Sequence, residues 1–245
     1  MLQAILFDLD STLVTESIFF RPLFLFPILK KFFPFISSPY TILKAFYLAI
    51  EKVKSSPHLP LGKTNYEIFL ESLHFSLKLP ISQLSLLVEE ILLQDLMKYA
   101  SFFRPMKGAK ESLKASFDLN IPVILATNPV FPLQAIKVRL KALDLVPEDF
   151  SFVTHAGNMS ATKPHREYYQ EIIKKQNLKP KECLMIGNDK IRDLIAYKEG
   201  FKTFWLFSSG PSPFLFLPLL KKNKMATYQG DHQQLLKIIK ILGQK

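Results

Sequence analysis

The pattern of hydrophobic positions predicts several buried strands separated by helices. Residues 4–7 form a short, continuously apolar run, as expected for a central strand of a parallel sheet that is covered on both faces. Similar runs lie at residues 121–126, 150–154, 183–187 and 202–207. Because strands and helices alternate along the chain, the pattern predicts an α/β fold with a Rossmann-like, doubly wound parallel sheet.

Helices are predicted in the segments between these strands. Apolar residues recur at helical spacing in residues 107–117, 132–143 and 166–176. A further helix is expected to begin at Asn188 and to end near Gly200, just before the strand at 202–207.

Residues 15–104 differ from the rest of the chain, because they contain no further strand-like run. Thr64 and Glu67 form a capping-box pattern at the start of one amphipathic segment, and Ser82 begins another. The sequence therefore predicts a catalytic core made of residues 1–14 and 105–245, with residues 15–104 inserted as an all-helical cap.

Composition limits the class of protein. The chain has 245 residues, of which 48% are hydrophobic and 22% charged, so it can bury a large core. A single cysteine, Cys183, excludes an internal disulfide framework and fits a reducing compartment. Because no basic leader or cleavage site precedes the first strand, we expect a cytoplasmic protein without a signal peptide.

Two apolar stretches require comparison with membrane-spanning segments. Charged residues and prolines interrupt residues 18–36, and Ser, Gly and Pro interrupt residues 204–220. Neither provides the roughly 20 unbroken apolar residues of a spanning helix. We expect the phenylalanines between Phe19 and Phe35 to form the core of the cap, or its interface with the catalytic core, in preference to a lipid site. The run Phe214–Leu217 could pack against a second copy of the chain, and the oligomeric state stays open.

The formal net charge of +11 raises the question of nucleic-acid binding. The basic residues, however, are spread at helix-like spacing, as in Lys137, Arg139 and Lys141. The cluster at residues 221–224 lacks the interleaved aromatic residues that stack on bases. We therefore interpret these residues as a solvated surface that attracts anionic substrates, and nucleic acid is not the expected partner.

Polar residues of complementary type follow the predicted strands. They are Asp8, Asp10, Thr127, Asn128, Lys163, Asp189 and Asp193. The carboxyl ends of parallel strands share one edge of the sheet, so these residues could converge there. Two acids beside a buried strand end repel each other unless a cation or a proton lies between them. If a helix begins at Asn188, Asp189 and Asp193 lie on one face of it.

This set resembles the haloacid dehalogenase-like hydrolase superfamily. The four motifs of that family appear in order: Asp8-Leu9-Asp10-Ser11-Thr12, then Thr127-Asn128 after an apolar strand, then Lys163-Pro164, then Gly187-Asn188-Asp189 with Asp193. The resemblance implies a helical cap inserted after the first motif. It also implies attack of Asp8 on a substrate phosphoryl group, with Mg²⁺ as the cofactor.

The resemblance further implies a role for each residue. Mg²⁺ is held by Asp8, the backbone carbonyl of Asp10 and Asp189, with Asp193 as a water-mediated ligand or a partner of Lys163. Lys163, the Thr127 hydroxyl and the Asn128 backbone N–H contact the phosphoryl oxygens. Because Asn188 precedes the acid of the fourth motif, either Asn188 or Asp189 could lie nearest the metal. We expect Asp189, since an anionic oxygen suits Mg²⁺ better.

Asp10 favours one activity within the family. A phosphate ester needs a general acid for its leaving oxygen, whereas expulsion of a halide does not, and dehalogenases lack an acid at this position. The sequence therefore predicts a phosphatase that acts on a small phosphorylated metabolite through an aspartyl-phosphate. The alternatives are a phosphotransferase or mutase of the same fold and a non-catalytic protein that binds a phosphorylated ligand or nucleic acid. The five histidines show no metal-ligand spacing, and Cys183 is interpreted as a buried strand residue.

Overall fold

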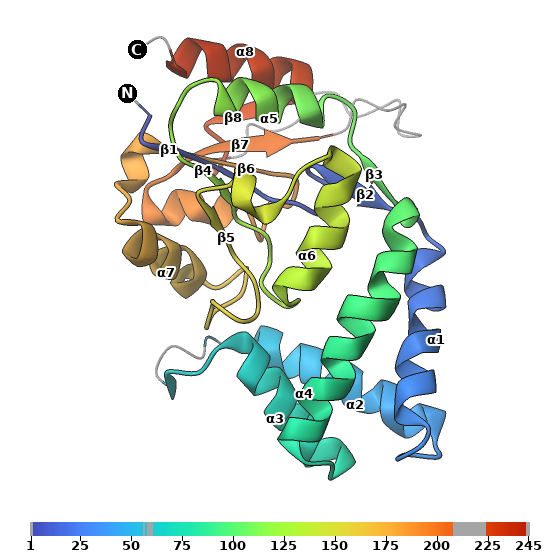
Figure 1. Ribbon diagram of the computed structural model, residues 1–245. Coiled ribbons are helices and arrows are strands. Elements are labelled where there is room, and N and C mark those ends of the chain that lie inside the picture. The colour runs from blue at the N-terminus through green and yellow to red at the C-terminus, as the bar shows by residue number, and fades with distance from the viewer. Residues whose placement is uncertain (1, 56, 58–60, 208–223, 244–245) are drawn as a thin grey trace, which may run out of the picture.

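A computed structural model describes residues 2–55, 57, 61–207 and 224–243. Its main feature is a six-stranded parallel sheet with the order β5-β4-β1-β6-β7-β8 (Figure 1). The strands are β1 (Ala4–Phe7), β4 (Val123–Leu125), β5 (Phe152–Val153), β6 (Cys183–Gly187), β7 (Lys202–Leu206) and β8 (Tyr228–Gly230). The first strand of the chain lies between β4 and β6, as its unbroken apolar sequence predicts.

Helices cover both faces of the sheet. They are α5 (Ala109–Phe117), α6 (Leu133–Leu140), α7 (Arg166–Gln176) and α8 (His232–Gly243), with short 3₁₀-helices at Lys141–Leu143, Pro147–Asp149, Pro180–Glu182 and Leu194–Glu199. Alternate side chains of β1 enter two separate apolar clusters. Ile5 and Phe7 pack with residues of α5, α6 and α8, whereas Ala4 and Leu6 pack with residues of α7.

The predicted Rossmann-like α/β sheet is confirmed. Two elements at its edge, β8 and α8, were not predicted from the sequence. The three residues of β8 are too few to show a strand period. The helix α8 lies beside α5 in the outer layer of the fold (Figure 1).

Residues 20–102 are mainly helical and extend beyond one end of the sheet (Figure 1). The helices are α1 (Phe20–Phe32), α2 (Pro39–Ser55), α3 (Asn65–Leu77) and α4 (Ile81–Glu90), followed by a π-helix at Ile91–Asp95 and a 3₁₀-helix at Leu96–Phe102. We refer to α1–α4 and these two short helices as the helical segment.

The expectation that residues 15–104 contain no strand is wrong. Two short strands, β2 (Val14–Glu16) and β3 (Phe103–Pro105), pair antiparallel where the chain leaves the sheet and returns to it. Each strand has only three residues, so the sequence shows no alternation. Their pairing depends on the two ends of the helical segment meeting, which is a property of the tertiary structure.

The start of α3 connects the helical segment to the sheet. The predicted capping box is present: the Glu67 backbone N–H donates to the Thr64 hydroxyl, and the Thr64 backbone N–H donates to the Glu67 carboxylate. The next residue, Asn65, is fully buried, and its Nδ2 donates to the carbonyls of Pro129 (3.1 Å) and Ala161 (3.3 Å). These two carbonyls belong to the loops that carry Asn128 and Lys163, so one side chain fixes both loops to the helical segment.

The phenylalanine-rich stretch divides between two environments. Phe20 and Phe32 are buried in the helical segment, as predicted, whereas Phe19 and Phe26 are 63% and 66% exposed. Among the described residues, no helix is both long and apolar enough to span a membrane. Residues 208–220, including the Phe214–Leu217 run, lie outside the described residues.

Candidate active site

Asp8 lies at the carboxyl end of β1 and forms a buried ion-pair cluster. The Asp8 backbone N–H donates to the Ile186 carbonyl (2.9 Å), which places the side chain between β1 and β6. Lys163 Nζ donates to Asp8 Oδ1 (2.8 Å) and to Asp193 Oδ1 (2.6 Å). The Lys163 side chain is 1% exposed, and those of Asp8 and Asp193 are 10% and 2% exposed. Three segments of the chain thus place two carboxylates around one ammonium group.

With both carboxylates ionised, this cluster carries one more negative charge than positive, and its pKa values reflect that imbalance. Burial, followed by the charge of Asp193, raises the pKa of Asp8 to about 7, although Lys163 opposes the rise. Burial alone would lower the pKa of Lys163, but Asp193 and Asp8 hold it well above its ordinary value. Lys163 therefore stays protonated, and a further cation beside Asp8 would favour the ionised carboxylate.

A turn, and not a helix, brings Asp189 and Asp193 together. The helix expected from Asn188 begins only at Leu194 and is a 3₁₀-helix, so the prediction that both acids lie on one helix face is wrong. Asp193 Oδ2 accepts the Asp189 backbone N–H (2.9 Å), and Asp189 Oδ1 accepts the N–H groups of Ile191 and Arg192. These side-chain bonds compete with helical hydrogen bonding, which explains the late helix start.

Gly187 allows Asp193 to approach the end of β6. A Cβ atom placed on Gly187 would lie 2.3 Å from the Asp193 carboxylate. Any side chain at this position would displace Asp193 from Lys163, so close packing against Asp193 requires a glycine in the fourth motif.

The hydroxyl of Thr12 lies between Asp8 and Asn188. Thr12 Oγ1 is 3.1 Å from Asp8 Oδ2 and 3.0 Å from Asn188 Oδ1. The loop that carries Thr12 is held by His232 of α8, whose Nε2 lies 3.0 Å from the Thr12 carbonyl oxygen. Ser11, in the same loop, adopts a φ of 63°, the left-handed conformation that glycine tolerates best.

Asp10 lines a cavity together with Asp8 and pairs with Arg139, a residue that was predicted to lie on a solvated surface. Arg139 Nε donates to Asp10 Oδ1 (2.9 Å). The Arg139 side chain is only 5% exposed, and its guanidinium lies 5.0 Å from the ring centroids of both Phe103 and Phe131. Arg139 is therefore a buried partner of Asp10, and its assignment to a solvated surface is wrong. Helical spacing places a residue on a face, but it does not reveal which neighbours cover that face.

Substitution of Arg139 is expected to impair turnover more than folding. In Arg139→Met, Asp10 loses the group that orients it, and we expect activity to fall about 10- to 100-fold. In Arg139→Lys, the charge returns but the planar stack between the phenylalanines does not, so recovery should be incomplete. Phosphate release and thermal unfolding would be measured beside Lys137→Met, a change at an exposed position of the same helix. Full activity in Arg139→Met would contradict a role for this pair.

Thr127 and Asn128 follow β4 at the same edge of the sheet. The Asn128 side-chain oxygen accepts the Lys163 backbone N–H (3.1 Å), which ties the second and third motifs together. Tyr168 donates its hydroxyl hydrogen to the Thr127 carbonyl (2.9 Å). These bonds fix the backbone of both motifs. The side chains of Thr127 and Asn128 line the same cavity as Asp8 and Lys163.

A cavity of about 700 Å³ contains the predicted site. All seven residues singled out from the sequence line it: Asp8, Asp10, Thr127, Asn128, Lys163, Asp189 and Asp193. Residues of the helical segment line its other side. No role was predicted for Arg139 or Asn65, or for Thr12 beyond its place in the first motif, because each makes a contact with a distant part of the chain.

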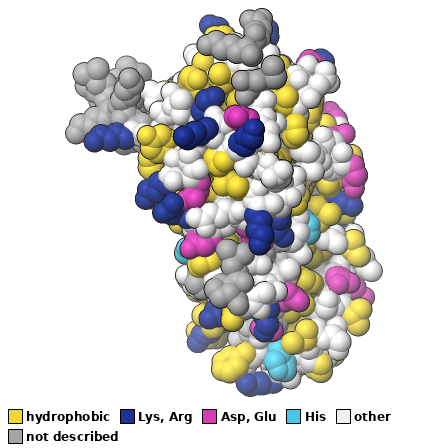
Figure 2. All heavy atoms as spheres, turned by 90° about the vertical axis from the view of Figure 1, so that its left-hand side faces the viewer, with side chains coloured by type: hydrophobic (Ala, Val, Ile, Leu, Met, Phe, Trp, Pro, Cys, Tyr) yellow, Lys and Arg dark blue, Asp and Glu magenta, His cyan; other side chains and the backbone are white. Residues whose placement is uncertain are grey.

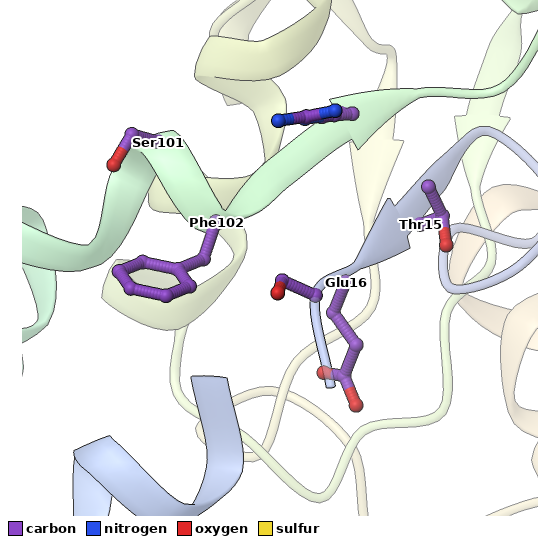
Figure 3. Close-up of a pocket in the computed structure, with 6 residues that line it drawn as sticks. Thr15, Glu16, Ser101 and Phe102 are labelled. Carbon is purple, nitrogen blue, oxygen red and sulfur yellow. The ribbon is translucent and has the colours of Figure 1, made fainter. Parts of the chain in front are cut away.

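A smaller cavity of about 340 Å³ lies beside the β2–β3 pair (Figure 3). Glu16 and Thr15 of β2 line it together with Ser101 and Phe102, which directly precede β3 (Figure 3). Among the described residues that line this smaller cavity, Glu16 is the only acidic one, and it forms an ion pair with Arg21. This cavity does not include Asp8 or Lys163, so the chemistry is assigned to the larger one.

The buried thiol and the basic surface do not add to the site. Cys183 is fully buried in β6, and burial raises its pKa to about 11, so it is a strand residue, as predicted. Lys and Arg side chains on the face shown in Figure 2 form several separate groups among acidic and apolar ones.

The oxygen atoms around Asp8 fit a magnesium ion. No group of three His, Cys, Asp or Glu side chains is clustered as metal ligands among the described residues. Mg²⁺, however, is usually bound through only one or two carboxylates and keeps several waters. Asp8 Oδ2 and Asn188 Oδ1 both lie beside the Thr12 hydroxyl, and Asp189 lines the same cavity. The excess negative charge of the buried cluster also favours a cation here.

Comparisons with known proteins point to one family. A family model described as haloacid dehalogenase-like hydrolase matches residues 2–200. Among solved structures, a phosphatase of this family from Thermococcus onnurineus is 18% identical, with a TM-score of 0.53 over 97% of this chain and 98% of that one. An L-2-haloacid dehalogenase from Xanthobacter autotrophicus is 12% identical, with a TM-score of 0.55 over 98% and 99%.

A third similar structure is a predicted hydrolase of the family from Bacillus subtilis, bound to magnesium. It is 16% identical, with a TM-score of 0.52 over 97% of this chain and 98% of that one. No curated protein matches the chain. At these identities, the solved structures support the fold and leave the reaction to be argued from the site.

Proposed function

The chain belongs to the haloacid dehalogenase-like hydrolase family, and we propose that it is a Mg²⁺-dependent phosphatase acting on phosphate monoesters. The observation that carries this proposal is the buried cluster of Asp8, Lys163 and Asp193, which opens into the same cavity as Asp10. A nucleophilic carboxylate and a second carboxylate for proton transfer are the two groups that such a reaction requires.

In the proposed reaction, Asp8 attacks phosphorus. An oxygen of the Asp8 carboxylate forms a bond to phosphorus while the bond to the alcohol oxygen breaks, and Asp10 gives that oxygen a proton. Water then attacks the aspartyl-phosphate and gives a proton to Asp10, which releases inorganic phosphate and restores Asp8. Lys163 Nζ, 2.8 Å from Asp8 Oδ1, orients the carboxylate and offers a positive charge to the phosphoryl oxygens.

Asp10 supports phosphatase over dehalogenase activity. Its side chain is 52% exposed and lines the cavity, so it can exchange protons with substrate and water. A halide leaves without a proton, and a dehalogenase would not need this acid.

Magnesium completes the proposed site. When bound, Mg²⁺ would offset the negative charges of Asp8 and the phosphoryl group and hold them together. We propose that Asp8 and the backbone carbonyl of Asp10 bind it, with Asn188 or Asp189 as the next ligand and Asp193 acting through Lys163. Asn188 is separated from Asp8 by one hydroxyl, whereas Asp189 has the negative charge but uses Oδ1 for two backbone N–H groups.

Residues 15–104 are proposed to act as a cap domain on a core of residues 1–14 and 105–245. Helices of this part line the cavity opposite Asp8, and closing would exclude water during reaction. The lone buried cysteine supports a cytoplasmic location, which cell fractionation would test.

Metal dependence provides the test of this proposal. We expect hydrolysis of p-nitrophenyl phosphate to fall more than about 100-fold in a chelator and to return with Mg²⁺. The variants Asn188→Ala and Asp189→Ala identify the ligand: loss of a true ligand should raise the Mg²⁺ concentration for half-maximal activity about 10- to 100-fold. The Mg²⁺-induced rise in melting temperature should weaken in the same variant. Full turnover in the chelator would contradict the proposal.

The same assay addresses transfer to another acceptor. A phosphotransferase would pass the phosphoryl group from Asp8 to an added alcohol, so free phosphate would fall short of the alcohol product released. Equal amounts of phosphate and alcohol product support hydrolysis.

A further inference from the structure

We propose that the substrate is the monophosphate ester of a bulky apolar alcohol, whose hydrocarbon lies against Phe24, Ile28, Phe46 and Ile91. This inference rests on the proposed phosphatase function, since it names the substrate class of the same site. It is carried by the division of the 700 Å³ cavity into an anionic end at Asp8 and an apolar wall formed by the helical segment.

The apolar wall comes from each helix of the helical segment. Phe24 and Ile28 belong to α1, Phe46 to α2, Phe69 to α3, and Ile91 follows α4 directly. The aromatic rings support one another, because the Phe46 ring lies 5.2 Å from Phe32 and 5.8 Å from Phe69. The wall is therefore packed from behind and presents carbon to the cavity.

The charged residues on this side are peripheral and paired. Arg21 is 81% exposed at its side chain and binds Glu16. Lys54 is 40% exposed and binds Glu51 at 3.1 Å. Among the described residues of the helical segment that line the cavity, only Arg21 and Lys54 carry a charge. The other polar side-chain groups of these lining residues are the hydroxyls of Tyr47 and Tyr66.

This wall suits hydrocarbon and not a sugar. A sugar phosphate has several hydroxyl groups, and each one buried without a hydrogen bond costs about 1–3 kcal/mol. An alkyl or isoprenoid chain instead gains about 0.8 kcal/mol for each methylene group that it buries. Because one water molecule takes about 30 Å³, a cavity of about 700 Å³ has room for roughly 20 groups of that size, which is enough for a phosphate and a chain of about ten carbons.

Hydrolysis of n-alkyl phosphates, from ethyl to decyl at monomeric concentrations, tests this inference. We expect kcat/KM to rise about 2- to 4-fold for each added methylene until the wall is covered, mainly through KM. Glucose 6-phosphate and glycerol phosphate should be poorer substrates than octyl phosphate. A rate independent of chain length, or faster for the sugar phosphate, would overturn the inference and leave the phosphatase proposal standing.

A pair of variants on α2 locates the effect. In Ile50→Thr, a hydroxyl replaces carbon in the cavity lining, and the ratio of kcat/KM for octyl over ethyl phosphate should fall about 3- to 10-fold. Leu48→Thr makes the same type of change at a position that is 44% exposed and outside the lining, so this ratio should not change. Equal ratios in both variants and the unaltered protein would contradict the assigned wall.

Binding separates this inference from the reaction itself. Alkylphosphonates resist hydrolysis, so calorimetric titration of the unaltered protein with ethyl- and octylphosphonate in Mg²⁺ measures affinity without turnover. Tighter binding of octylphosphonate would support the apolar wall. If no phosphate ester is hydrolysed, that result rejects the phosphatase proposal and leaves the evidence for the wall unchanged. Equal affinity of the two phosphonates would reject the wall.

Discussion

Replacement of Asp8 with asparagine is expected to abolish phosphatase activity while making the metal-free protein more stable. Removal of a nucleophile from a group of residues that act together lowers turnover by about 10⁴-fold or more. The fold should remain, because the amide has the shape of the carboxylate and Lys163 keeps Asp193 as its partner. Phosphate release and the free energy of unfolding are the measurements.

The gain in stability follows from the pKa of Asp8. In the folded protein this pKa is raised to about 7 by burial and by Asp193, so the native state holds a proton that the unfolded chain releases at lower pH. Stability in a chelator should therefore fall as pH rises from about 4 to about 7, by about 3–4 kcal/mol. The Asp8→Asn variant has no carboxyl to ionise at this position, so its stability should not show this fall, and near pH 7 it should be more stable than the unaltered protein.

The matched control is Asp118→Asn, which changes an exposed carboxylate paired with Lys114. Its effect on stability should be small, as is typical of surface ion pairs. Retained turnover in Asp8→Asn would exclude Asp8 as the nucleophile, and an unchanged pH dependence would contradict the charge imbalance of the cluster.

Replacement of Lys163 with methionine is expected to have the largest effect on stability. Asp8 and Asp193 would then share a buried site without their cation, and loss of one partner from a buried pair costs about 3–5 kcal/mol. Activity should also fall steeply, since the charge that orients Asp8 disappears. Urea unfolding and phosphate release measure the two effects.

A second variant separates charge from packing. In Lys163→Met with Asp193→Asn, only one buried carboxylate remains, so part of the lost stability should return while activity does not. Lys110→Met removes a half-exposed lysine paired with Asp144 and should change stability by less than about 1 kcal/mol. If the double variant is as unstable as the single one, uncompensated charge is not the cause.

Three kinds of pattern in the sequence predicted the central sheet, one helix start and the candidate site residues. Apolar runs such as residues 4–7 and 183–187 are short and flanked by turn residues, and a sheet covered on both faces buries every side chain of such a strand. The capping box at Thr64 was also readable, since its bonds join residues three positions apart. Polar residues at the strand ends, such as Asp8, and in the loops that follow, such as Lys163, were found because parallel strands bring their carboxyl ends to one edge.

Contacts between distant residues required the tertiary structure. Arg139 is indistinguishable from its neighbouring lysines in the sequence, and only the folded chain places it between Phe103 and Phe131 and against Asp10. The turn at Asp189 forms instead of a helix because the Asp193 carboxylate, held by Lys163, also accepts the Asp189 backbone N–H. The pairing of β2 with β3 and the apolar wall of the cavity likewise depend on how the helical segment packs.

By itself, the sequence of this protein determined the order of the five strands β1, β4, β5, β6 and β7, most of the helices between them, and the types of side chain at the sheet edge. The tertiary structure alone decided which charges are buried together and what faces them across the cavity. The physical reason is that hydrogen-bond periodicity and chain connectivity act over a few residues, whereas burial and electrostatic pairing depend on neighbours that can be more than a hundred residues away in the chain.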